Sequence, residues 1–79
     1  MRVSVKLFAT LVFHVSGVKP GVPFEVELPD QATISGLMKQ LNLPKREVKV
    51  AFVNGRVRTE DFQLHDGDEV GIFPPIAGG

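Results

Sequence analysis

The sequence predicts an α+β roll in which one main helix packs on one face of a mixed β-sheet. Several short segments alternate between apolar and polar residues, which is the period of a strand with one buried face. One segment near mid-chain instead has the i, i+3, i+4, i+7 apolar spacing of an amphipathic helix. Packing this helix against the sheet is the simplest way to bury both apolar surfaces.

The first two strands are expected at residues 2–8 and 24–28, where every second residue is apolar. Their inward residues are Val3, Val5, Leu7, Phe24, Val26 and Leu28. The intervening residues 9–22 include two glycines and a proline, so we predict a loop that can include a short helical turn. Strands this close in sequence are expected to pair as a hairpin.

The helix is expected to begin near Thr33 or Ser35, because either hydroxyl can cap its first turn. The apolar stripe of this helix consists of Ile34, Leu37, Met38 and Leu41. Residues 42–44 contain an asparagine and a proline and should end the helix.

The third strand is expected at residues 48–53 and is apolar on both faces. The sequence therefore leaves open which pair faces the helix, Val50 and Phe52 or Ala51 and Val53. We favour the interpretation in which Phe52 points outward.

The remaining elements follow from turn signals. Asn54-Gly55 predicts a type I′ turn, because both central positions of that turn need positive φ. A short return strand is expected at residues 56–58, and a turn at residues 65–68 should precede a final strand at residues 69–73. The order strand, strand, helix, strand, short strand, strand is that of a β-grasp.

The 79 residues are expected to form one domain at residues 1–73, followed by a flexible tail at residues 74–79. Pro74 and Pro75 cannot donate ladder hydrogen bonds, so they should end the last strand. A pair of prolines also favours an extended backbone, which would project the tail away from the sheet.

Composition and charge exclude several function classes. The chain has no cysteine, which excludes a disulfide scaffold and a cysteine nucleophile. Nine basic residues balance nine acidic ones, so no overall field attracts nucleic acid. No apolar run approaches the roughly 20 residues that a bilayer requires. We expect a cytoplasmic protein with neither a nucleic-acid nor a membrane partner.

The chain offers little catalytic machinery of its own. His14 and His65 lack the spacing of metal ligands. Asp66 and Asp68 flank Gly67, a pattern more typical of a turn than of an acid/base pair. No glycine-rich phosphate-binding motif is present. We expect no metal site, no bound cofactor and no catalytic site within this chain.

Three phenylalanines are candidates for a docking surface. If the apolar residues of the first and last strands face the helix, Phe8 and Phe73 face away from it, as does Phe52 in the favoured interpretation. Together they would form an aromatic patch at the root of the tail, and such patches commonly mark a partner surface. The alternative is that residues 9–22 fold over them.

The tail has properties suited to entering another protein. Residues 74–79 can reach about 20 Å when extended. Ile76 and Ala77 are small enough to lie in a groove, and Gly78-Gly79 permits close approach of another backbone. The reactive group would be the Gly79 carboxylate, which needs activation, such as adenylation by ATP, before a nucleophile can attack it. The alternative is a frayed terminus without function.

Several segments together resemble the MoaD/ThiS family of ubiquitin-like sulfur carriers. These segments are Val5-Lys6-Leu7-Phe8-Ala9, Val53-Asn54-Gly55, Asp66-Gly67-Asp68-Glu69-Val70 and Phe73-Pro74-Pro75-Ile76-Ala77-Gly78-Gly79. The ending is most similar to the MoaD branch, the small subunits of molybdopterin synthase. Residues 10–15 are more apolar than the short charged helix that many members have there.

The resemblance implies a mechanism. An adenylating enzyme of the MoeB/ThiF type would use ATP to activate the Gly79 carboxylate, and sulfur would replace AMP to give a thiocarboxylate. Residues 74–78, Pro74-Pro75-Ile76-Ala77-Gly78, would insert into a MoaE-type large subunit, where the sulfur forms the dithiolene of molybdopterin. Phe8, Phe52 and Phe73 would dock the partner, the first and last of these also by their position in the family pattern.

Two other functions remain open on the sequence. A ThiS-type carrier would supply sulfur for the thiazole of thiamine or for another thiolation pathway. A ubiquitin-like modifier would instead have Gly79 joined to lysines of other proteins.

Overall fold

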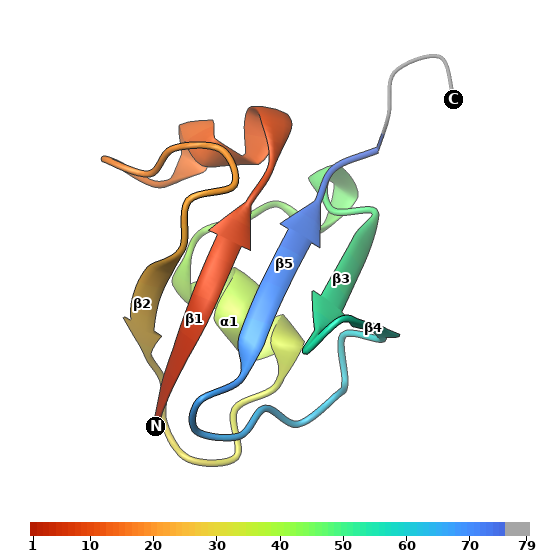
Figure 1. Cartoon of the computed structure of the whole chain (residues 1–79). Coiled ribbons are helices and arrows are strands. Elements are labelled where there is room, and N and C mark those ends of the chain that lie inside the picture. Colours follow the sequence, from red (N-terminus) through yellow and green to blue (C-terminus); the bar gives the residue numbers. More distant parts are fainter. Residues whose placement is uncertain (76–79) are drawn as a thin grey trace.

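The computed structural model describes residues 1–75. It contains one five-stranded sheet in the order β2-β1-β5-β3-β4, with the helix α1 on one face (Figure 1). The strands are β1 (Arg2–Leu7), β2 (Phe24–Glu27), β3 (Val50–Val53), β4 (Arg56–Arg58) and β5 (Glu69–Phe73). The helices are α1 (Ile34–Gln40) and the short 3-10 helices η1 (Ala9–His14) and η2 (Lys45–Glu47). The predicted α+β roll with β-grasp topology is confirmed.

The first and last strands of the chain lie side by side at the centre of the sheet. β1 pairs antiparallel with β2, as the hairpin prediction requires, and parallel with β5. β5 pairs antiparallel with β3 on its other side, and β3 pairs with β4. β5 is therefore held by a neighbour along both edges.

The core lies between α1 and the sheet face that the alternating residues form. Its fully buried large side chains are Leu7, Leu11, Ile34, Leu37, Leu64, Ile72, Val3, Val5 and Val70. The two faces of β3 are also resolved, because Ala51 and Val53 are buried whereas Phe52 points to the open face. The favoured interpretation of this strand is thus confirmed.

The helix begins and ends as its sequence signals predict. Thr33 caps it, since its Oγ1 accepts a hydrogen bond of 3.2 Å from the Gly36 N–H. Asn42 has a positive φ of 58°, which turns the chain out of the helix. This turn places Leu43 in the core, while Leu41 is only partly buried.

Two segments are defined further by the structure. Residues 9–14 form η1, the helical turn that the loop prediction allowed for, and Leu11 and Val12 of η1 are buried. The third strand begins at Val50 and not at Val48. The reason is that η2 occupies residues 45–47 and Val48 closes its last turn.

Side-chain hydrogen bonds join the turn between β3 and β4 to the turn that precedes β5. We call the pair Asn54 and Asp68 the side-chain clamp. Asn54 and Gly55 both have positive φ, 51° and 83°, as the type I′ prediction requires. The Asn54 amide donates to Asp68 Oδ1 at 2.9 Å, and its oxygen accepts from the Glu69 N–H at 2.9 Å. Asp68 Oδ2 accepts from the His65 N–H at 2.8 Å. Asp68 is buried and serves the turn, as predicted.

Replacing this clamp should cost stability without touching the open face. Asp68→Ala leaves the His65 N–H and the Asn54 amide without their acceptor, so we expect the free energy of unfolding to fall by about 2 kcal/mol. Urea unfolding monitored by circular dichroism measures this. The control Glu69→Gln changes a neighbouring exposed carboxylate and should stay within about 0.5 kcal/mol of wild type. Equal stability of Asp68→Ala and wild type would contradict the assignment.

Candidate functional site

The candidate site is the end of the sheet where β5 stops. β5 ends at Phe73, followed by half-buried Pro74 and exposed Pro75 outside the strand. The other predicted tail residues, Ile76, Ala77, Gly78 and Gly79, lie outside the described residues.

The structure brings the three predicted docking phenylalanines together on the open face of the sheet. The rings of Phe8 and Phe73 stack with centroids 4.1 Å apart and planes 4° apart. Phe52 meets Phe73 edge to face, with centroids 5.5 Å apart. We call Phe8, Phe52 and Phe73 the aromatic cluster. Each ring is half-buried because the rings cover one another, so the cluster is a preformed surface with little freedom to lose on binding.

A shallow pocket of about 420 Å³ opens within this cluster. Gly71 lies opposite Lys6 in β1 and Phe52 in β3, and its missing side chain leaves the floor open. A Cβ there would contact Phe8 Cε2 at 3.6 Å and Phe73 Cε1 at 3.7 Å. Sequence reasoning missed Gly71, although a glycine at an outward strand position between strong strand formers is a signal of close packing.

The loop after η1 flanks the cluster without burying it. Gly21 donates its N–H to the Leu7 carbonyl at 2.9 Å, which brings the loop alongside the end of β1. A Cβ at Gly21 would lie 3.5 Å from Phe8 Cε1, so the loop rests against one edge of that ring. All three rings still line the open pocket. The alternative in which residues 9–22 cover the phenylalanines is therefore not what the structure has.

Val57 extends the apolar surface onto β4. It is paired directly with Phe52 and is 60% exposed. Val57 is the one apolar residue of its short strand, which is a signal in the sequence that it could belong to an apolar surface. A strand of only three residues, however, does not show which face of the sheet this residue is on.

Two charged residues, Lys6 and Glu69, are among those that line the pocket. At the opposite end of β1, Arg2 donates a hydrogen bond of 2.7 Å to Glu27 Oε1. This bond and its charge attraction raise the pKa of Arg2 and lower the pKa of Glu27. Both side chains are exposed, so the shifted pKa values mark a surface ion pair away from the tail.

The described residues hold no cluster of metal-ligating side chains. Within residues 1–75, no three His, Cys, Asp or Glu side chains lie close enough to hold a metal ion. His14 contacts Glu47 at 2.9 Å, a pair that joins η1 to η2. No helix in this part of the chain is long and apolar enough to span a membrane. The pocket beside the end of β5 is mostly apolar and is suited to bind an apolar side chain.

The chain resembles known proteins over nearly its whole length. The ThiS family model matches residues 5–79. A Pyrococcus furiosus protein, provisionally described as molybdopterin converting factor, subunit 1, is 31% identical, with a TM-score of 0.73 over 96% of this chain and 99% of that one. No curated protein matches the sequence.

More distant structures share the fold. Small archaeal modifier protein 1 of Haloferax volcanii is 21% identical, with a TM-score of 0.73 over 95% of this chain and 98% of that one. A chain from the complex of subunits 1 and 2 of the Helicobacter pylori molybdopterin-converting factor is 20% identical, with a TM-score of 0.63 and 100% of both chains covered.

Proposed function

The chain belongs to the ThiS family of ubiquitin-like sulfur carriers, and we propose that it is the sulfur-donating small subunit of a molybdopterin synthase. The observation that carries the proposal is its 31% identity, over almost the full length of both chains, to a protein described as subunit 1 of a molybdopterin converting factor. The family match extends through Gly79, so it includes the Gly-Gly ending at which we propose the sulfur is carried.

The proposed chemistry takes place at the Gly79 carboxylate. An adenylating enzyme of the MoeB/ThiF type first directs a carboxylate oxygen onto the α-phosphorus of ATP, and pyrophosphate leaves. A sulfur donor at the oxidation level of sulfide then displaces AMP, which gives the thiocarboxylate. Transfer of that sulfur to the pterin precursor, with water supplying the oxygen, regenerates the carboxylate. Gly79 suits these steps because no β-carbon hinders attack at its carbonyl.

This chain's described residues would position the tail for those steps. The aromatic cluster at the end of β5 offers an apolar anchor beside Pro74, so a partner that binds the cluster is placed next to the tail. We propose a MoaE-type large subunit as the partner that uses the sulfur. Subunits 1 and 2 form a complex in the Helicobacter pylori molybdopterin-converting factor, and the matching chain of that complex has the same fold.

The test is reconstitution with purified proteins. Chain carrying a Gly79 thiocarboxylate, mixed with the large subunit of the same organism and the pterin precursor, should form molybdopterin, detected after oxidation by its fluorescence. Chain with an ordinary carboxylate is the matched control and should form none. A thiocarboxylate that supports only thiazole synthesis would replace this proposal with a carrier for thiamine. Lysine-linked conjugates from cells would instead indicate a modifier.

A further inference from the structure

A second apolar surface lies beside the root of the tail, on η1. Phe13 is 84% exposed, the largest exposure among the large apolar side chains of the described residues. A single exposed phenylalanine is common on proteins. Phe13, however, borders a shallow hollow of about 660 Å³ with Val12, Val15, Val18 and Pro20. We call these five residues the η1 surface.

The fold fixes Phe13 in its outward position. Leu11 and Val12, the two residues before it, are buried in the core, so the short helix cannot turn Phe13 inward without exposing them. His14 then bonds to Glu47 of η2 at 2.9 Å. The η1 surface is therefore held rigidly, although no described residue covers Phe13.

The η1 surface is continuous with the end of the sheet from which the tail leaves. Phe8 directly precedes η1 and stacks on Phe73, and its N–H donates to the Ile72 carbonyl at 3.3 Å. η2 lies at the same end, since the Lys49 N–H donates to the Phe73 carbonyl at 2.8 Å. Figure 1 shows the segment of η1 at the same end of the sheet as the end of β5. A protein that approaches this end would meet η1 as well as the aromatic cluster.

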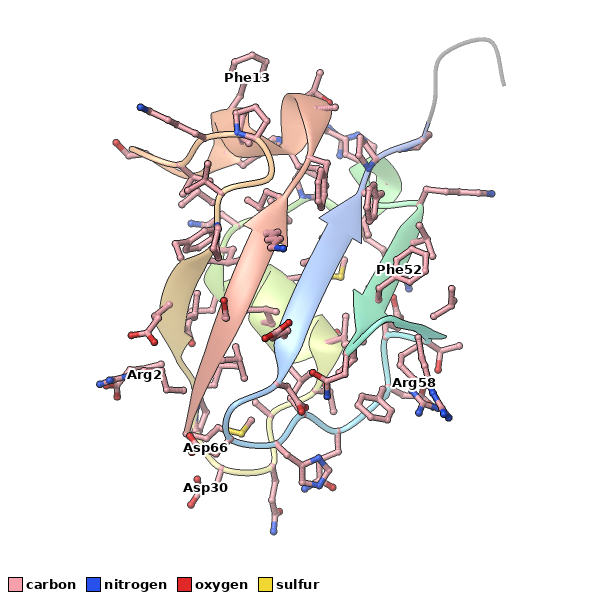
Figure 2. All side chains as sticks on the ribbon, viewed as in Figure 1. Arg2, Phe13, Asp30, Phe52, Arg58 and Asp66 are labelled. Carbon is pink, nitrogen blue, oxygen red and sulfur yellow. The ribbon has the colours of Figure 1, made fainter. Side chains whose placement is uncertain are left out.

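Positive charge predominates toward the end of the sheet where β5 stops. Exposed cations of the segments at this end are Lys19, Lys45, Arg46 and Lys49, of which Lys45 pairs with Glu60 and Arg46 with Glu47. Within residues 1–75, neither Lys19 nor Lys49 pairs with a carboxylate. Carboxylates instead gather around Arg2 at the other end, where Glu25, Glu27, Asp66 and Glu69 line one hollow. Figure 2 shows Phe13 at one end and Arg2, Asp30 and Asp66 at the other.

We propose that the η1 surface, in addition to the aromatic cluster, is a docking site for the adenylating enzyme. The matching surface of that enzyme would be an apolar hollow bordered by carboxylates. The proposal rests on the proposed activation of Gly79, the one step that every sulfur-carrier or modifier role of this chain requires. The basic tail end of a chain with no net charge turns toward an acidic surface during approach. Phe13 then adds apolar contact beyond that of the aromatic cluster.

The experiment is ATP–pyrophosphate exchange by the adenylating enzyme of the same organism, measured against the concentration of the full chain. Phe13→Ser should raise the KM for the chain by about tenfold with kcat unchanged, because it removes binding that is equal in ground and transition states. Phe13→Leu, which keeps an apolar side chain, should recover most of that loss. Folding is unaffected, since Phe13 is exposed in the free chain.

Reversing the charge of lysines on this chain tests whether the enzyme surface that binds the chain carries carboxylates. The double variant Lys19→Glu and Lys49→Glu should raise the KM by about tenfold at low salt and by much less at about 0.5 M salt, where charges are screened. Lys39→Glu, a single charge reversal on α1, is the control for each of the two single variants, Lys19→Glu and Lys49→Glu, and should leave the KM within about twofold. An unchanged KM for Phe13→Ser would overturn this inference alone. No exchange with the wild-type chain would overturn the proposed function and this inference with it.

Discussion

Deleting Gly79 is expected to abolish sulfur transfer while leaving the domain folded. The carboxylate of the shortened chain would be about 3.5 Å short of its reaction site, and a misplacement of 1 Å already costs about 100-fold in rate. The fold should be unchanged because β5, the last strand, ends at Phe73. Molybdopterin formation in the reconstituted synthase, with urea unfolding of the same sample, measures both effects.

The matched control keeps the length of the tail. Ile76→Val alters a tail side chain by one methyl group and should retain sulfur transfer. Adding one alanine after Gly79 should abolish it, since the new terminal residue has a β-carbon beside its carboxylate and extends past the reaction site. Sulfur transfer by the deleted or the extended chain at the wild-type rate would contradict the proposed role of Gly79.

Phe73→Ala is expected to weaken binding to the large subunit far more than it weakens the fold. Phe73 contacts both other rings of the aromatic cluster, so its loss opens the cluster at its centre. Truncating a central aromatic anchor costs about 2 kcal/mol or more in binding, which is about 30-fold in Kd. The half-buried ring should contribute only about 1 kcal/mol to folding through its stacking contacts. Calorimetry of the complex and urea unfolding measure the two costs.

Phe62→Ala is the matched control for this prediction. Phe62 is also a partly buried phenylalanine, but it packs against the core beneath the Arg58 guanidinium, 4.7 Å from its ring centre. Its truncation should lower stability and leave affinity for the large subunit unchanged. If Phe73→Ala lost stability and affinity in equal measure, Phe73 would belong to the core and not to a docking surface.

Much of the fold could be predicted because single residues carried clear signals. Alternation in β1 and β5 identified their buried residues, and Asn54-Gly55 specified a turn that few other pairs adopt. The outward position of Phe52 was a choice between two patterns, which β3 alone did not decide. Pairing with β5 decides it, since Ala51 lies opposite buried Ile72.

The sequence predicted less about the surfaces that partners would use. Residues 9–14 contain apolar residues without a clear period, and a 3-10 helix of this length leaves no stripe that a pattern can reveal. The exposure of Phe13 follows only once Leu11 and Val12 are seen in the core. The role of Gly71 likewise depends on its tertiary contacts. A side chain there would meet the rings of Phe8 and Phe73, and the sequence of β5 alone does not show that these rings lie beside it.

The parallel pairing of β1 and β5 also has a mechanical consequence. A partner that pulls on the tail pulls along the axis of β5, whereas the hydrogen bonds of β5 to β1 and β3 run across that axis. A pull on the residues after Phe73 would therefore load both ladders of β5 together. We expect the domain to stay folded while a partner holds the tail.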